Sequence, residues 1–293
     1  MVSTASVVIF LLAYLLLPFV LMVRAFRFPG EADVRRWAGA YGVVLNEANR
    51  PHIVEYLRRS RRFRATGGCL CWLLSGLPVL LERLAPYGTG SLLLAGYFGG
   101  AALAEATLAW PRPEEGRRRA LLTPRRVGDY LASWVRPVLW SAAVLVPLLA
   151  VLYALVLDGR APPEGRATVG ELWRGAAVVV VVALVSELAQ RLVVARAQPA
   201  SSPDLVAADD ACRAASVSTA AGAGLGIALA GLASMTSALA YLTDVRLVRW
   251  SLLVACIPVI VLSLAALFSV IFKGYSPEPW FFGRRPVASS QPG

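Results

Sequence analysis

Seven stretches of the sequence are apolar over nearly the length that a helix needs to cross a bilayer, and they constrain the fold more than any other feature. A spanning helix needs about 20 such residues, because each residue rises about 1.5 Å and lipid cannot hydrogen-bond the backbone. The stretches are residues 6–23, 67–84, 91–110, 137–157, 173–194, 217–242 and 250–272. We therefore predict an all-α, polytopic membrane helical bundle of about seven transmembrane helices.

Composition supports this fold class. Apolar residues make up 57% of the chain and the mean hydropathy is +0.62, which is more apolar than a soluble globular protein. The formal charge is +11, and all 29 basic residues are arginines except Lys273. A basic membrane protein first suggests anionic lipid headgroups as partners, so we expect the lipid bilayer and not nucleic acid. The excess of arginine over lysine is typical of a high-GC genome.

The distribution of basic residues predicts the orientation. Twenty-three of them fall in segments 24–64, 111–136, 191–213 and the tail from Lys273, whereas six fall in the alternate loops. Because positively charged loops stay in the cytoplasm, we expect the N-terminus outside and the C-terminus inside a cell (plasma) membrane. No basic residue precedes the first apolar stretch, so we expect an uncleaved anchor instead of a secretory signal.

This reading divides the chain into alternating membrane and cytoplasmic parts. They are an N-terminal anchor helix (1–30), a basic cytoplasmic segment (31–66), a transmembrane hairpin (67–110), a second basic segment (111–136), a second hairpin (137–194), a third cytoplasmic segment (195–216), a third hairpin (217–272) and a cytoplasmic tail (273–293).

Each cytoplasmic segment contains a proline that is typical of a helix start: Pro51, Pro124 and Pro203. Each segment then leads into a hairpin, so three related units after the anchor are one interpretation. Helix starts that resemble each other without common descent are the other. The first segment either lies at the headgroup level or folds as a short soluble hairpin.

A row of small residues in the sixth stretch predicts a helix-packing face. Small side chains let helix backbones approach closely in lipid, although a stretch rich in Ala, Gly and Ser also gives such rows by chance. The row has four-residue spacing and consists of Ser218, Gly222, Gly226, Ala230, Ser234 and Ala238.

Ionisable residues within spans are costly and are therefore candidates for function. Glu105 lies in the third stretch, and Glu187 lies in the fifth with Gln190 and Arg191 beside it. One interpretation is an intramembrane polar cluster that responds to protons or cations. The other, which we favour, is a pair of interfacial carboxylates neutralised by arginines, as the spacing of Glu187 and Arg191 allows.

Two runs of arginine lie in the basic segments. Arg58, Arg59, Arg61, Arg62 and Arg64 follow Tyr56 and are predicted to bind lipid headgroups, since each charge near an anionic leaflet contributes about 1 kcal/mol. The second run, between Arg117 and Arg126, has fewer aromatic neighbours, and fixing the topology is the favoured role for it.

Catalytic and metal motifs are not evident in the sequence. His52 is its only histidine, so a site with two histidines is impossible within one chain, and we expect no catalytic residue, no metal and no cofactor. The cysteines Cys69, Cys71, Cys212 and Cys256 lie in or beside apolar segments without paired spacing, and we interpret them as small apolar fillers.

Two runs carry a resemblance. Residues 41–68, with Asn49-Arg50-Pro51 and Tyr56-Leu57-Arg58-Arg59, and residues 204–215, with Ala208-Asp209-Asp210-Ala211, resemble uncharacterised polytopic membrane proteins of high-GC Gram-positive, actinobacterial-type bacteria. The resemblance implies location and topology, and it transfers no activity or site residue.

Three classes of function follow from these features. A non-catalytic subunit or scaffold of a membrane complex, with a possible membrane-protein partner, is favoured by the small-residue row and the large cytoplasmic pieces. A small-solute transporter or permease component is suggested by Glu105, Glu187 and the possible repeats. A lipid-modifying enzyme is suggested only by arginines that suit a phosphate.

Overall fold

A computed structural model describes residues 26–80, 125–157, 167–196, 202–242 and 246–271, together with residues 16, 20, 22 and 23. These residues are predominantly helical, and no β-strand forms among them. The chain divides into two compact units. The first comprises residues 1–124, 195–213 and 286–293, and the second comprises residues 125–194 and 214–285.

Four helices supply the second unit: α5 (Val135–Leu157), α6 (Val169–Ala195), α7 (Pro203–Leu242) from residue 214 onward, and α8 (Arg246–Ile271). Among the described residues, these are the four helices that are long and apolar enough to cross a membrane. They coincide with the predicted spans 137–157, 173–194, 217–242 and 250–272. The other three predicted spans lie wholly or partly outside the described residues, so the count of seven stays a prediction.

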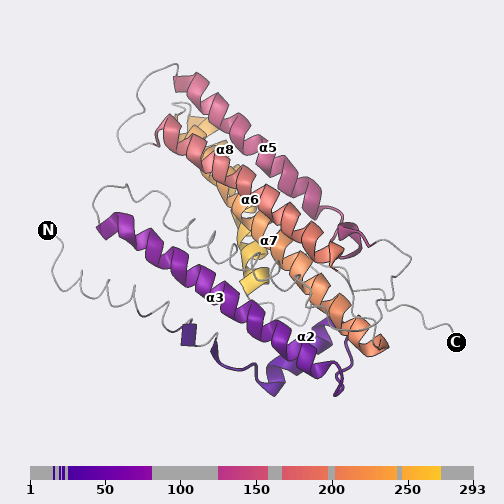
Figure 1. The fold of residues 1–293 in the computed structure, drawn as a ribbon. Helices are drawn as coiled ribbons and strands as arrows, with labels where there is room; N and C mark the ends of the chain where they lie inside the picture. Colours follow the sequence, from indigo (N-terminus) through magenta and orange to yellow (C-terminus); the bar gives the residue numbers. More distant parts are fainter. Residues whose placement is uncertain are drawn as a thin grey trace. The chain divides into compact units, whose positions relative to one another are not determined.

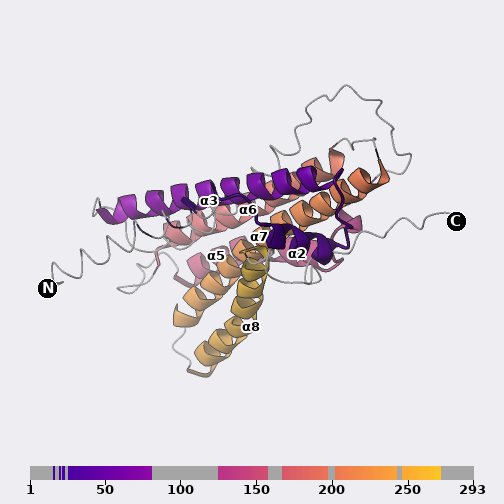
Figure 2. The same cartoon turned by 90° about the horizontal axis from the view of Figure 1, so that it is seen from below.

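Contacts between the helices show that α5 and α6, and likewise α7 and α8, run in opposite directions. The start of α5 meets the end of α6 through Arg136 and Glu187, and the end of α5 meets the start of α6 through Tyr153, whose hydroxyl donates to the Ala167 carbonyl at 2.7 Å. Helices α5 and α6 are therefore antiparallel, and they lie side by side in Figure 1. Helix α8 likewise runs back along α7, as Figure 2 shows.

Helix α7 is held on two sides by close contacts at small residues. A methyl group built on Gly224 would lie 2.6 Å from the Ser186 side chain, and one built on Gly231 would lie 2.4 Å from Val179, so α6 approaches too closely for any larger residue to fit without a shift. On the α8 side, the Ser263 hydroxyl donates to the Gly226 carbonyl at 2.8 Å. The close approach is the kind that small residues permit in lipid.

The predicted packing face is covered by the chain's own helices for only part of its length. Ser218, Gly222 and Gly226 are buried, whereas Ala230 and Ser234 are exposed and Ala238 is half-buried. The reason is geometric, because a four-residue step turns about 400°, so five steps wind the row about 200° around the helix. The seven-residue spacing of Gly224 and Gly231 keeps both on one face.

The first unit is built on α2 (Glu31–Tyr41) and α3 (Arg50–Leu80), with the first residues of α7. Helix α2 ends in a Schellman motif, in which Gly42 takes a φ of 67° and the Val43 amide donates to the Ala38 carbonyl at 2.9 Å. Helices α2 and α3 pack through Trp37, which lies 5.7 Å from Tyr56 between ring centroids. The hydrophobic residues that surround this contact on α2 and on α3 are buried.

The helix starts differ among the three proline segments. Helix α3 begins at Arg50 and α7 at Pro203, and both run on through the predicted membrane boundaries at 66 and 216 without a break. In the second segment, residues 125–134 form only the short 3₁₀ helix η1 (Val127–Asp129). The Asp129 carboxylate accepts from the Arg126 amide at 2.7 Å, a local bond that competes with helix extension. Within the described residues, this segment therefore lacks the helix that the interpretation of three related units places after Pro124.

Candidate functional site

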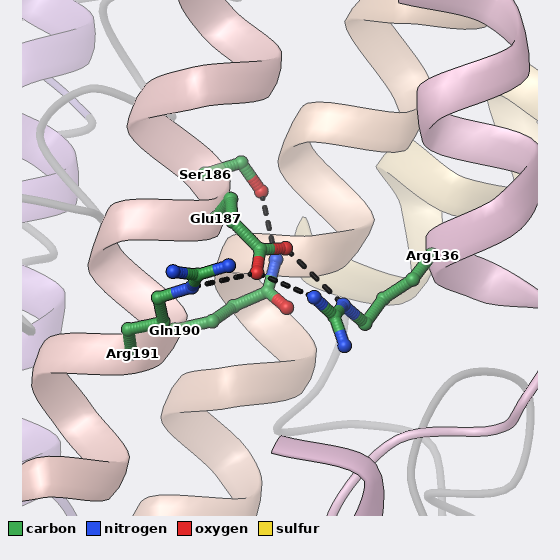
Figure 3. Close-up of polar contacts among 5 residues, drawn as sticks. All are labelled: Arg136, Ser186, Glu187, Gln190 and Arg191. Carbon is green, nitrogen blue, oxygen red and sulfur yellow. Dashed lines mark hydrogen bonds and ion pairs between the residues drawn. The ribbon is translucent and has the colours of Figure 1, made fainter. Parts of the chain in front are cut away.

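Glu187 is the centre of a polar cluster in the second unit. Its Oε1 accepts from Arg136 Nη2 at 2.6 Å and from Arg191 Nε at 2.9 Å, and its Oε2 accepts from Arg136 Nε at 3.2 Å. Arg136 therefore holds the carboxylate with two nitrogens from α5, while Arg191 holds it from one turn further along α6 (Figure 3). The Glu187 side chain is 8% exposed, so burial of the charge is compensated by both guanidinium groups.

Ser186 and Gln190 extend this cluster into the core. Gln190 is fully buried and donates through Nε2 to the Ser186 hydroxyl at 3.0 Å, and that hydroxyl donates to the Ala220 carbonyl of α7 at 2.8 Å. The Gln190 Oε1 is buried and has no hydrogen-bond partner within the described part of the chain. The cluster thus connects α5, α6 and α7 at the level of Gly224, one of the two glycines of α7 that α6 approaches most closely. We name Arg136, Ser186, Glu187, Gln190 and Arg191 the Glu187 cluster.

The predicted polar group is brought together in part. Glu187, Gln190 and Arg191 lie as expected on one stretch of α6, whereas Glu105 lies outside the described residues. Arg136 and Ser186 were missed by the sequence analysis. Arg136 directly precedes a predicted span at the same membrane level as Arg191, and that position was the available signal. Because both Glu187 oxygens are occupied by guanidinium donors, the arrangement fits the structural interpretation better than a proton- or cation-binding one.

A second cluster, in the first unit, is more deeply buried and was not predicted. Asp209 is fully buried and its Oδ2 accepts from Arg213 Nε at 2.8 Å, one turn further along α7. Its Oδ1 lies 3.2 Å from Arg196 Nη2 and 4.0 Å from His52 Nε2. Arg213 is 1% exposed and also donates through Nη1 to the Arg196 carbonyl at 2.7 Å. We name His52, Arg196, Asp209 and Arg213 the Asp209 cluster.

The sequence did contain a signal for this second cluster. Asp209 and Arg213 have the same acid-then-arginine spacing of four residues as Glu187 and Arg191. They were overlooked because residues 195–216 were predicted to be a cytoplasmic connection, in which such a pair would be solvated. The structure instead places them inside a continuous helix of 40 residues.

The predicted headgroup patch lies on α3, and its arginines are largely engaged within the chain. Arg59 pairs with Glu55 at 2.6 Å and Arg61 pairs with Asp33 at 2.9 Å. Arg58 and Arg62 stand over the rings of Phe28 and Phe26, at 5.3 and 5.0 Å from the ring centroids. Arg64 is half-buried on the same helix. The two ion pairs reduce the charge available to a headgroup, and binding of lipid by this patch stays a prediction.

The described residues contain no group of three or more His, Cys, Asp or Glu side chains placed to hold a metal ion. Cys69, Cys212 and Cys256 are buried and form no disulfide with one another, which fits small apolar fillers. The Cys256 thiol also donates weakly to the Ala233 carbonyl at 3.7 Å, which adds to the contact between α7 and α8.

No protein-family model, curated protein or solved structure matches the chain.

Proposed function

We propose that the chain is a multi-pass protein of the plasma membrane that acts as a non-catalytic subunit or scaffold of a membrane complex. The observation that carries this proposal is the exposure of α8. Within the most apolar window of each candidate span, 11% of α8 is buried, compared with 33% to 44% for α5, α6 and α7. A helix with so little cover from its own chain is the best placed of the four to pack against a second protein.

The exposed residues of α8 have a spacing that suits such packing. Large apolar side chains recur at alternating steps of three and four residues, the pattern by which one helix inserts its side chains between those of another. They are Leu247, Trp250, Val254, Ile257, Val261 and Leu264, and each is at least 47% exposed. Lipid contact alone is the competing explanation, since α6 also exposes apolar residues such as Leu188.

The hydrogen bonds that Glu187 accepts favour the role of a subunit over that of a transporter. In a transporter, a carboxylate that binds and releases protons or cations needs oxygens that are free to accept them. Both Glu187 oxygens instead accept from Arg136, which joins α5 to α6, and Oε1 also accepts from Arg191 of α6 itself.

Photo-crosslinking in native membranes tests the proposal. A photoreactive amino acid at Ile257, which is 57% exposed on α8, should give an adduct with a different protein. The matched control is Leu188, also 57% exposed but on α6, which should give none. Lipid adducts alone at both positions, with the chain migrating as a single protein after mild solubilisation, would contradict the proposal.

The orientation is part of the same proposal, and cysteine labelling tests it. After replacement of the four native cysteines, Val44→Cys, at a side chain that is 81% exposed, reports on the basic segment, and Gly170→Cys reports on the loop before α6. An impermeant maleimide should label Gly170→Cys in intact cells and Val44→Cys only after permeabilisation. The reverse pattern would invert the topology.

A further inference from the structure

An open hollow of about 430 Å³ lies at the start of α5, within the second unit. Its walls are mostly apolar, and they come from the segment before α5 and from the first turns of α5 itself. Gly128, Leu131 and Ser133 line it from the segment before α5, and Arg136 and Trp140 line it from α5. Arg136 and Trp140 are four residues apart, so they lie on the same face of the helix.

Arg136 brings an uncompensated charge to this hollow. Its Nε and Nη2 hold Glu187, and within the described part of the chain its Nη1 has no partner. The Glu187 cluster contains two guanidinium groups and one carboxylate, so it retains one net positive charge. The Arg136 side chain is 41% exposed, which leaves its outer edge open to an anion.

The hollow lies at the end of a candidate span, where a bilayer changes from hydrocarbon to headgroups. Trp140 lines the hollow and Trp134, which is 37% exposed, stands just before α5. Tryptophan is enriched at this level because its ring is apolar and its N–H is polar. An apolar hollow, a cationic group at its wall and flanking tryptophans together match the chemistry of a phospholipid.

We propose that this hollow binds one anionic phospholipid, with the phosphate on the open edge of Arg136 and an acyl chain against Leu131 and Trp140. The charge selects the ligand, since a zwitterionic headgroup would bring its own cation toward two arginines. The site uses none of the α3 arginines and does not depend on the proposed role as a subunit.

Native mass spectrometry of the full-length chain tests the proposal. The detergent-purified protein is titrated with phosphatidylglycerol and with phosphatidylcholine of the same acyl chains. Phosphatidylglycerol should bind about fivefold more tightly, which corresponds to about 1 kcal/mol for one arginine near a headgroup. Arg136→Gln should abolish this preference. Arg174→Gln, which removes an exposed arginine near the other end of α6, is the charge-matched control and should keep it.

Because Arg136→Gln also breaks the bond to Glu187, a second pair of variants isolates the hollow. Nothing lies within 4 Å of a methyl group built on Gly128, so Gly128→Leu should fill the hollow and reduce phosphatidylglycerol binding at least fivefold without touching Glu187. Glu187→Gln leaves Arg136 in place with more free donors and should increase binding.

Three results would overturn the proposal. Equal binding of both lipids would indicate an acyl-chain contact without charge selection. Unchanged binding in Gly128→Leu would place the lipid elsewhere, for example on the arginines of α3. Displacement of the lipid by inorganic phosphate at millimolar concentration would indicate a general anion site.

Discussion

The Glu187 cluster and the Asp209 cluster are built from the same parts but differ in how deeply their arginines are buried. In each, a carboxylate pairs with an arginine one turn further along its own helix and with a second arginine from elsewhere in the chain. Arg136 and Arg191 are 41% and 68% exposed at the side chain, whereas Arg196 and Arg213 are 19% and 1% exposed.

This difference matters because a guanidinium group that can reach water or headgroups keeps its hydration when its partner is lost. A guanidinium group that is enclosed by protein does not, and the energy of breaking the pair is then mainly the cost of leaving a bare buried charge. The two clusters therefore predict unequal responses to the same chemical change.

The largest effect is expected from Asp209→Asn. It removes the charge that compensates Arg213, which is almost completely buried, so the variant should lose about 3–5 kcal/mol of stability. The measurement is reversible unfolding in SDS and mild detergent, followed by tryptophan fluorescence. Asp204→Asn is the matched control, because Asp204 lies in the first turn of the same helix, is exposed, and accepts a hydrogen bond from the uncharged Asn46 side chain.

Removing both charges sharpens this prediction. In Asp209→Leu with Arg213→Met, the two most deeply buried charges are removed together and only Arg196, which is 19% exposed, loses its partner, and apolar replacement of a buried pair is often neutral. The double variant should recover most of the stability that Asp209→Asn loses. A loss as large as that of the single variant would mean that packing, and not charge, explains the effect.

Glu187→Gln should destabilise the chain less, by about 1.5–3 kcal/mol, the usual range for hydrogen bonds to charged groups. Arg136 and Arg191 would lose their partner but are exposed enough to be solvated. Glu171→Gln is the control on the same helix, because Glu171 caps its start by accepting from the Thr168 amide at 2.7 Å, a role that glutamine also fills. If Glu187→Gln lost as much stability as Asp209→Asn, the two clusters would not differ in the way proposed here.

Part of this site could be predicted from the sequence, and the rest could not for a physical reason. The spacing of Glu187 and Arg191 is local, and helix geometry alone brings the two side chains together. Arg136 is 51 residues away from Glu187, and Arg196 comes to Asp209 from beyond the end of α6. Such contacts depend on how helices pack, which a single sequence does not specify.

The fold likewise could be predicted from the sequence only in part. Long apolar stretches predicted α5 to α8 because length and hydropathy decide whether a helix can span a bilayer. The glycines that α6 approaches most closely were missed, because Gly224 and Gly231 do not stand out among so many small residues. The predicted packing face was instead a row of small residues with four-residue spacing, although such a row winds around the helix.

Gly224→Ala tests the packing that supports the Glu187 cluster. The new methyl group would lie 2.6 Å from Ser186, so Ser186 must move and its bonds to Ala220 and Gln190 weaken. We expect a loss of about 1–2 kcal/mol, within the range for overpacked cores.

The control for this change is Gly175→Ala, in which the methyl group meets Met235 at an ordinary 3.6 Å. It should be neutral or slightly stabilising, because alanine favours helix. The same SDS unfolding assay compares both. An unchanged Gly224→Ala variant would show that α6 and α7 can separate at little cost.

The smallest effect is expected at the ion pair of Asp33 and Arg61 between α2 and α3, which extends the comparison to a more exposed pair. Their side chains are 27% and 34% exposed and lie 2.9 Å apart, so Asp33→Asn should cost less than about 1 kcal/mol.

The same pair predicts a dependence on pH and on lipid. Partial burial raises the pKa of Asp33, but hydrogen bonding and the charge of Arg61 outweigh it and hold that pKa below its usual range. A carboxylate with a lowered pKa in the folded state stabilises above its unfolded pKa, near 4, and this contribution is lost as the pH falls through the folded value. The wild type should therefore lose its small advantage over Asp33→Asn below about pH 4. At neutral pH, Asp33→Asn should also free Arg61 and increase binding to anionic vesicles at low salt. Equal stability of the two proteins at every pH, with equal vesicle binding, would mean that Asp33 neither stabilises the first unit nor restrains Arg61.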